Sequence, residues 1–273
     1  MSLFSLRAAA IFAAPALLGL TSCSGTKQVA GETVVGRTPE FYWSAAMETW
    51  AAGDYVKTAD HLDHLLSSTN VYTARAIPWS LVLTGGMAAG YMELADDYAA
   101  GAHIKKTDAL AFNHKAYELR AAASKLALHF AENVEILGQW RTGPVPLAFP
   151  FPRGTAAQPA LASQIAAGIE LVPADRDMAQ RLIIERNVLL AACLASGSPN
   201  DAAKTAEIFG HDGATVTRTV FAKGLAHMLE RESTLYERQQ LDDPEKLAIF
   251  KQRAQFVLSS AGSSPIIMKA VAH

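Results

Sequence analysis

The sequence contains no long block of like charge. Its 24 basic and 26 acidic residues give a formal net charge of −2 and are spread along a chain of 273 residues. A protein that binds nucleic acid neutralises phosphates through a concentrated basic face, and an interaction tail would be visible as a run of one charge. We therefore expect no nucleic-acid partner.

Extended alternation of apolar and polar residues, the pattern that predicts β-strands, is nearly absent. Aromatic residues make up only 8% of the chain, whereas 50% of it is hydrophobic and alanine is abundant. This composition suits helices that pack closely through small side chains. We therefore expect an all-α fold, and the length allows one large domain or two small ones.

Cysteine is scarce, and no apolar run near the start is long enough for a membrane span. Only Cys23 and Cys193 occur in the chain, and the apolar stretch at residues 8–20 has 13 residues. A transmembrane helix needs about 20 apolar residues. Because this stretch follows Arg7 and precedes small residues, it fits the apolar core of a secretory signal peptide.

The residues from Leu20 to Cys23, LTSC, resemble the lipobox of bacterial lipoproteins. The resemblance implies that residues 1–22 are removed and that Cys23 becomes an acylated N-terminus, which would anchor the protein to a membrane. In lipoproteins of Gram-negative bacteria, a residue other than aspartate after this cysteine favours the outer membrane, and Ser24 fits that pattern. The expected location is therefore the periplasmic side of the outer membrane. The alternative is an ordinary signal peptide with a chance cysteine.

Behind this leader, the chain divides into three parts. Residues 23–38 are small and polar and lack helical periodicity, which predicts a lipidated N-terminus with a flexible tether. Residues 39–260 predict a helical domain, and residues 261–273 predict a loosely held tail. Cys193 stands in an apolar helical run without a disulfide partner, so we expect it to pack as a small hydrophobic side chain.

Residues 41–68 carry the most informative pattern of the helical domain, with a turn predicted at GDY, residues 53–55. The segment resembles a tetratricopeptide-type helical hairpin. The residues that carry this resemblance are Tyr42, Ala45, Ala46, Gly53, Tyr55, Leu62 and Leu65. Thr49 replaces the usual aromatic residue, Thr58 the usual alanine and Asn70 the closing proline. The resemblance implies antiparallel helical hairpins stacked as a tetratricopeptide-like repeat.

Other helical patterns surround this segment. Thr38 is a suitable N-cap before Pro39. Gly86 and Gly90 have a spacing that can mark a dimer face in a membrane, but the apolar stretch around them is short, so we expect close contact between helices of the folded domain. Buried helical stripes are predicted at Ala116, Leu119, Ala123, Leu126, Phe130, Val134 and Leu137, at Phe221, Leu225, Met228, Leu229, Leu235 and Tyr236, and at Leu247, Phe250, Ala254 and Val257.

Residues 141–159 contain five prolines and interrupt the helical rhythm. Proline lacks an amide donor and has a fixed φ, so no helix can cross this segment. Leu147, Phe149 and Phe151 make it too apolar for a simple solvated linker. We expect a proline-rich loop that packs against its own domain. The alternative is a segment that docks onto a partner in an extended, polyproline-like form.

Residues 88–102 and 116–133 resemble, in layout, the T-component lipoproteins associated with TRAP-type solute transporters. In outline the resemblance extends over residues 40–258, and the proline-rich loop has no counterpart in it. It implies a periplasmic scaffold with cryptic tetratricopeptide-like repeats. It also implies that the scaffold meets a periplasmic solute-binding protein or a small ligand.

Motifs that carry chemistry are few. DHLDH, at residues 60–64, places two histidines and two aspartates on one helix, but zinc would need further ligands fixed nearby. No HExxH motif, cysteine cluster, GxSxG elbow or phosphate-binding loop occurs. We interpret residues 60–64 as a solvated helix face and expect no catalytic residue, metal or cofactor.

The sequence therefore favours a non-catalytic lipoprotein that acts as a helical-repeat adaptor or binding scaffold. The candidate contacts with a ligand or partner are aromatic, although each also fits packing in the core: Trp79, Trp140, Phe149 and Phe151. Two alternatives stay open: an envelope-assembly or cell-wall scaffold, and a hydrolase with an unrecognised site. An oligomer is compatible with the favoured function and with both alternatives.

Overall fold

The computed structural model describes residues 38–139, 143–152, 157–209, 211, 213–238 and 244–260. Several predicted features lie outside the described residues: the expected signal peptide, the expected lipid attachment at Cys23, the tether before Thr38, Trp140 and the expected tail at 261–273. All described residues belong to the unit that runs from Arg37 to His273.

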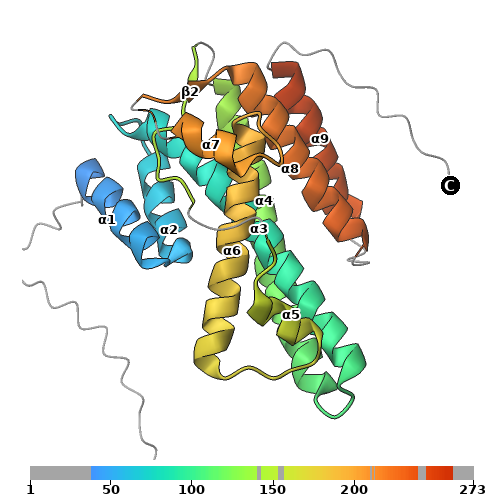
Figure 1. Ribbon diagram of the computed structural model, residues 1–273. Coiled ribbons are helices and arrows are strands. Elements are labelled where there is room, and N and C mark those ends of the chain that lie inside the picture. The colour runs from blue at the N-terminus through green and yellow to red at the C-terminus, as the bar shows by residue number, and fades with distance from the viewer. Residues whose placement is uncertain are drawn as a thin grey trace, which may run out of the picture. The chain divides into compact units, whose positions relative to one another are not determined.

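The described part of the chain is mostly helical, which confirms the all-α class (Figure 1). Its helices are α1 (Pro39–Ala52), α2 (Tyr55–Leu66), α3 (Thr73–Ile104), α4 (Ala109–Gln139), α5 (Ala160–Ala166), α6 (Pro173–Ala195), α7 (Ala202–Phe209), α8 (Arg218–Arg238) and α9 (Pro244–Ser260). Two short strands, β1 (Val145–Pro146) and β2 (Thr215–Val216), pair antiparallel.

Helix α3 is the centre of the fold. Every residue from Ala76 to Met92 is buried, because α2, α4, α5, α6, α8 and β1 all contact this helix. A helix that is apolar around its whole circumference needs such burial on every side. Figure 1 shows the α1–α2 hairpin on one side of α3 and the α8–α9 pair on the other. Among the described helices, none combines the length and apolarity that crossing a membrane requires.

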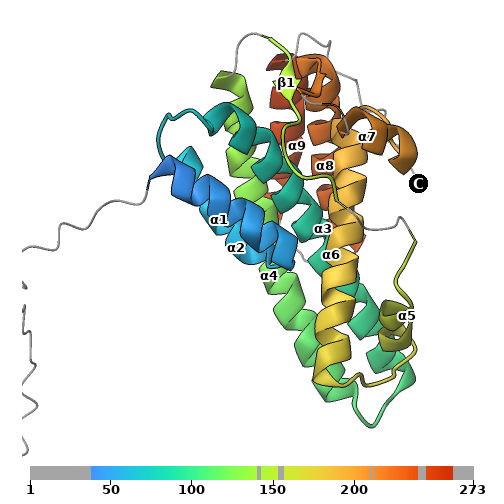
Figure 2. The same cartoon turned by 60° about the vertical axis from the view of Figure 1, so that its left-hand side comes forward.

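The predicted hairpin is confirmed as α1 and α2, which lie side by side in Figure 2. Thr38 caps α1 by accepting a hydrogen bond from the backbone N–H of Phe41 at 3.3 Å. Gly53 ends α1 with a φ of 78°, a left-handed conformation that glycine adopts without strain. The Tyr55 hydroxyl donates to Glu185 of α6 at 2.6 Å, so the hairpin is tied to the central helices.

Helices α3 and α6 approach each other closely at two glycines, as the sequence predicted. A Cβ atom on Gly86 would lie 2.5 Å from Cα of Val188, and one on Gly90 would lie 3.2 Å from Cα of Ile184. Only residues without a side chain allow the two backbones to come this near. The spacing of these glycines therefore serves packing inside the domain.

The three predicted apolar stripes face the core. Phe130 on α4, Tyr236 on α8 and Phe250 on α9 are among the largest fully buried side chains. Leu126 and Leu247 are only partly buried and pack against the same core. Cys193 is buried on α6 without a disulfide, in agreement with its predicted packing role.

The proline-rich segment packs against its own domain. Val145 and Leu147 are buried, and the backbone N–H of Leu147 donates to the carbonyl of Ala214 at 2.8 Å. The ring of Phe149 stacks on Trp79 of α3 at 6.3 Å and meets Phe209 of α7 edge-on at 4.9 Å. The small β1–β2 pairing was not predicted, because two residues are too few to show alternation.

Candidate ligand-binding pocket

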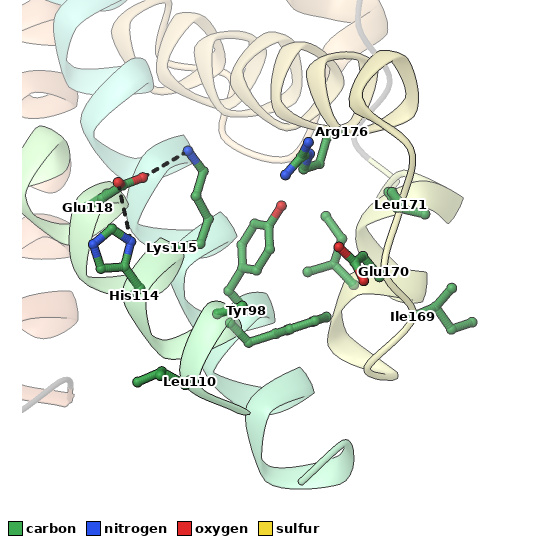
Figure 3. Close-up of a pocket in the computed structure, with 12 residues that line it drawn as sticks. Tyr98, Leu110, His114, Lys115, Glu118, Ile169, Glu170, Leu171 and Arg176 are labelled. Atoms are coloured by element: carbon green, nitrogen blue, oxygen red, sulfur yellow. Dashed lines mark hydrogen bonds and ion pairs between the residues drawn. The ribbon is translucent and has the colours of Figure 1, made fainter. Parts of the chain in front are cut away.

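A pocket of about 620 Å³ lies where the end of α3, the start of α4, α5 and the segment between α5 and α6 meet. Its volume falls in the range of small-molecule sites, about 300–1,000 Å³. Figure 3 shows its lining in close-up. We call it the Tyr98 pocket, after the α3 tyrosine that points into it.

Two glycines allow the pocket to form at this end of α3. A Cβ atom on Gly101 would lie 2.3 Å from the carbonyl oxygen of Ile165, so α5 rests directly on α3 here. Gly168 follows α5 with a φ of 77° and lies against Lys105, which turns the chain toward α6. The turn between α3 and α4 is closed by an ion pair of 2.6 Å between Lys105 and Asp108. These contacts set the distance between the two sides of the pocket.

The wall of the Tyr98 pocket is mainly apolar. Phe112, Ile165 and Leu171 are buried and form its inner part. Leu110 and Ile169 lie at the rim, where Leu110 is 85% exposed and Ile169 is 50% exposed. Large apolar side chains at such exposure retain surface that a bound molecule could remove from water.

Two polar groups in the pocket make no hydrogen bond or ion pair with a described residue. Tyr98 is only 7% exposed, its ring contacts Phe112 at 5.5 Å, and its hydroxyl makes no hydrogen bond to a described residue. Burial raises the pKa of Tyr98, an effect that the nearby positive charge of Arg176 opposes. Arg176 forms no ion pair with a described residue, and Figure 3 shows its guanidinium next to the hydroxyl end of Tyr98.

The other charges of the pocket are of two kinds. Lys115 and His114 both engage Glu118, at 3.1 and 3.4 Å, and are thereby held on α4. Glu170 lies on the segment between α5 and α6 and has no ion pair with a described residue. Among the described residues, the pocket thus presents a guanidinium and a carboxylate that form no ion pair, both on exposed residues, and a tyrosine hydroxyl above an apolar wall.

The histidine-rich segment of α2 does not gather into one site. Asp63 faces α4, where its carboxylate lies 3.0 Å from Nε2 of His129. His64 stacks on Tyr42 of α1 at 4.5 Å, and the ring of His61 lies 6.2 Å from the same tyrosine. The hydrogen bond to Asp63 raises the pKa of His129. Within the described ranges, no group of three or more potential metal ligands is present.

A buried polar network joins α3, α6 and α8. Glu93 forms an ion pair with Arg186 and accepts a hydrogen bond of 2.9 Å from Asn187. Arg231 donates to the side-chain carbonyl of Asn187 at 2.6 Å. These residues are directed at one another and away from the Tyr98 pocket, so the network fixes three helices.

Asp97 lies one turn beyond Glu93 and accepts hydrogen bonds of 3.3 Å from Gln158 at both carboxylate oxygens. Burial, reinforced by the negative charge of Glu93, raises the pKa of Asp97 to about 7. The fully buried Glu232 on α8 has its pKa raised to about 8, chiefly by burial. Neither acid lines the Tyr98 pocket.

The aromatic residues singled out in the sequence have different positions. Trp79 is fully buried and contacts Trp43, Trp50 and Phe149, so it packs in the core. Phe149 is buried beside it, and Phe151 is half-buried with its ring 5.4 Å from that of Phe209. The structure brings these three residues toward the same side of the core. Trp140 and Cys23 lie outside the described residues.

Sequence reasoning missed the Tyr98 pocket, because its parts come from two stretches about seventy residues apart. Tyr98 reads as an ordinary apolar position of a helix, and Arg176 as a surface charge in the first turn of α6. One local signal was present: GIELVP, residues 168–173, carries apolar residues between two helices. No family model, curated protein or solved structure was found to match this chain.

Proposed function

We propose that this chain is a non-catalytic binding scaffold, held at a membrane by a lipid on Cys23 and built to hold a small molecule in the Tyr98 pocket. The observation that carries the proposal is the pocket itself, with an apolar wall and polar groups at its mouth. Binding sites for small molecules share this design, in which apolar contact supplies affinity and a few polar groups fix orientation.

The arrangement of charges supports binding rather than turnover. Catalysis by acid, base or nucleophile needs reactive groups within hydrogen-bond reach of one another and of the reacting atom. In the pocket, His114 and Lys115 are engaged by Glu118 on the outer face of α4. The two groups left to meet an acceptor of the ligand are the hydroxyl of Tyr98 and the guanidinium of the exposed Arg176, which both donate hydrogen bonds.

The scaffold part of the proposal rests on the helical hairpins. The sequence of the α1–α2 pair resembles a tetratricopeptide unit, and we propose that this hairpin and the following helices form a degenerate helical repeat. The sequence resemblance to T-component lipoproteins makes a periplasmic solute-binding protein the partner to test first. In that role the scaffold would present its ligand to the transport machinery at the outer membrane or near it.

The anchor is tested by metabolic labelling with a palmitate analogue. The full chain should incorporate the label and remain with membranes after a high-salt wash, and Cys23→Ala should lose both properties. Cys193→Ala is the matched control, because Cys193 is buried in α6 and should leave labelling unchanged. Membrane attachment of Cys23→Ala would overturn the lipoprotein proposal.

The partner is tested by affinity purification of the lipidated chain from membranes, followed by mass spectrometry. Recovery of a periplasmic solute-binding protein, reproduced with the two purified proteins, would support the transport role. Recovery of envelope-assembly proteins or peptidoglycan alone would contradict it and favour a structural scaffold.

A further inference from the structure

We infer that the Tyr98 pocket takes an α-amino acid with an apolar side chain, bound through its carboxylate at Tyr98 and Arg176 and through its ammonium at Glu170. The inference rests on the proposed function that this pocket is a binding site. It adds the chemical class of the ligand and the role of each polar group.

The first step is the hydroxyl of Tyr98. Tyr98 is more than nine-tenths buried, and its hydroxyl points into the pocket without a hydrogen bond to any described residue. The oxygen itself is not among the fully buried polar atoms without a partner, so it keeps contact with solvent through the pocket, and a bound acceptor would replace water there. A tyrosine hydroxyl donates well to an anionic acceptor. The Tyr98 hydroxyl is therefore placed to donate a hydrogen bond to the carboxylate of a molecule bound in the pocket.

The second step is the guanidinium of Arg176. It lies beside the hydroxyl end of Tyr98 and has no ion pair with the described residues (Figure 3). The positive charge of Arg176 opposes the rise that burial causes in the pKa of Tyr98. Arginine presents several donors in a planar fork that matches a carboxylate. Together, Tyr98 and Arg176 form a pair of hydrogen-bond donors for one carboxylate.

The third step is Glu170, which distinguishes an amino acid from a simple apolar acid. Its carboxylate lines the same pocket from the segment between α5 and α6 and has no ion pair with the described residues. The neighbouring Lys115 is paired with Glu118, and Lys105 with Asp108, although the charge of Lys105 also interacts with that of Glu170. A ligand with only a negative charge would leave Glu170 opposed to it, whereas a zwitterion satisfies both unpaired charges.

The fourth step is the apolar wall. Phe112, Ile165 and Leu171 provide a buried surface, and Leu110 and Ile169 add exposed surface at the rim. The pocket volume of about 620 Å³ accommodates a side chain of the size of leucine or phenylalanine with its main-chain groups. Burial of such a side chain supplies the affinity, and the three polar groups set the orientation.

The test is calorimetric titration of the full chain in detergent with L-phenylalanine and L-leucine. Two analogues of phenylalanine isolate the charges: 3-phenylpropanoate lacks the ammonium group and 2-phenylethylamine lacks the carboxylate. We expect saturable binding of both amino acids, and binding of each analogue at least about tenfold weaker, since one lost charged hydrogen bond costs about 1.5–3 kcal/mol.

Three variants test the assigned groups. Arg176→Gln should weaken phenylalanine binding by about tenfold. Tyr98→Phe should also weaken phenylalanine binding. Glu170→Gln should weaken the binding of phenylalanine. The same variant should bind 3-phenylpropanoate with unchanged or higher affinity. Lys57→Gln is the control, because Lys57 is an exposed residue of α2 outside this pocket. Circular dichroism melting curves would confirm that each variant is folded.

The outcomes separate this inference from the proposed function. Failure of both amino acids to bind, or binding that none of the three variants weakens, would overturn the inference. Equal affinity for phenylalanine and 3-phenylpropanoate would also overturn it, because the pocket would then select apolar anions, and the proposed binding role would stand. Loss of the proposed anchor would appear separately, in the labelling of Cys23→Ala.

Discussion

The hydroxyl oxygens of Thr49 and Thr58 lie 3.0 Å apart across the first helical hairpin. These are two of the positions at which the hairpin departs from the tetratricopeptide pattern. Each hydroxyl also lies near a carbonyl of its own helix: that of Thr49 is 2.8 Å from the carbonyl of Ala45, and that of the fully buried Thr58 is 2.9 Å from the carbonyl of Asp54. Because each hydroxyl has one proton, one threonine donates to the other and the acceptor donates to its carbonyl. The two threonines thus form a polar contact between α1 and α2.

Removing one hydroxyl of this pair should weaken the hairpin. Thr58→Val keeps the shape of the side chain but deletes its hydrogen bonds, and we expect the free energy of unfolding to fall by about 1 kcal/mol. Urea unfolding would measure the loss. The Thr49→Val/Thr58→Val double variant should lose less than the sum of the single variants, because both remove the same contact. Strict additivity would contradict an energetic link between the two threonines.

The close approach of α3 and α6 leads to a ranked prediction. Alanine at Gly86 would place its Cβ atom 2.5 Å from the backbone of Val188, whereas alanine at Gly90 would lie 3.2 Å from that of Ile184. The first contact requires the helices to separate, so Gly86→Ala should reduce stability by about 2 kcal/mol or more. Gly90→Ala should cost less, because the gain in helix propensity offsets a smaller strain. Thermal unfolding of both variants checks this order, and a greater loss for Gly90→Ala would refute it.

Local sequence patterns predicted much of the fold. The hairpin boundaries followed from Thr38, Pro39 and Gly53, whose backbone preferences act within a few residues. The buried stripe of α4 followed from helical periodicity alone. The Gly86 and Gly90 pair predicted a close helix contact, although periodicity does not reveal that α6 is the partner.

The candidate pocket depends on contacts that no local pattern encodes. In the sequence, Gly101 looks like any small residue of a helix. Only the structure shows that α5 rests on it. Asp97 reads as a helix-end charge, yet Gln158 reaches it from the end of the proline-rich segment, and burial raises its pKa. Trp79 and Phe149 were singled out as aromatic residues, and only the packed structure distinguishes a core stack from an open surface.

The contact between His129 and Asp63 should make the docking of α2 on α4 depend on pH. The hydrogen bond to Asp63 raises the pKa of His129 above its ordinary value near 6.5. The stabilisation is therefore fully present below pH 6.5 and is lost as the pH rises through the higher pKa of the folded state. Unfolding measured between pH 6 and 9 should show this decline. In His129→Gln the corresponding part of the pH dependence should disappear, and an unchanged profile would contradict the assignment.

Asp97 should make stability depend on pH in the opposite sense to an ordinary salt-bridged acid. Its pKa rises from about 4 in the unfolded chain to about 7 in the folded protein. The folded state therefore binds the extra proton between these values, so that stability falls as the pH rises from about 4 to about 7. The groups that act on the carboxyl are Glu93 and Asp96, which repel its charge, Arg186, which attracts it, and Gln158, which donates to it.

Asp97→Asn isolates this effect, because the amide keeps the size of the side chain and a hydrogen-bond acceptor for Gln158 but carries no charge. We expect the variant to match the parent protein near pH 4 and to exceed it in stability at pH 8, where the parent must bury a carboxylate. Because the buried Glu232 has its pKa raised to about 8, the comparison should be repeated in a Glu232→Gln background to remove its overlapping titration. Urea unfolding at several pH values in both backgrounds measures the difference. A variant that is less stable than the parent at pH 8 in both backgrounds would mean that the Asp97 charge stabilises the contact between α3 and the segment that carries Gln158.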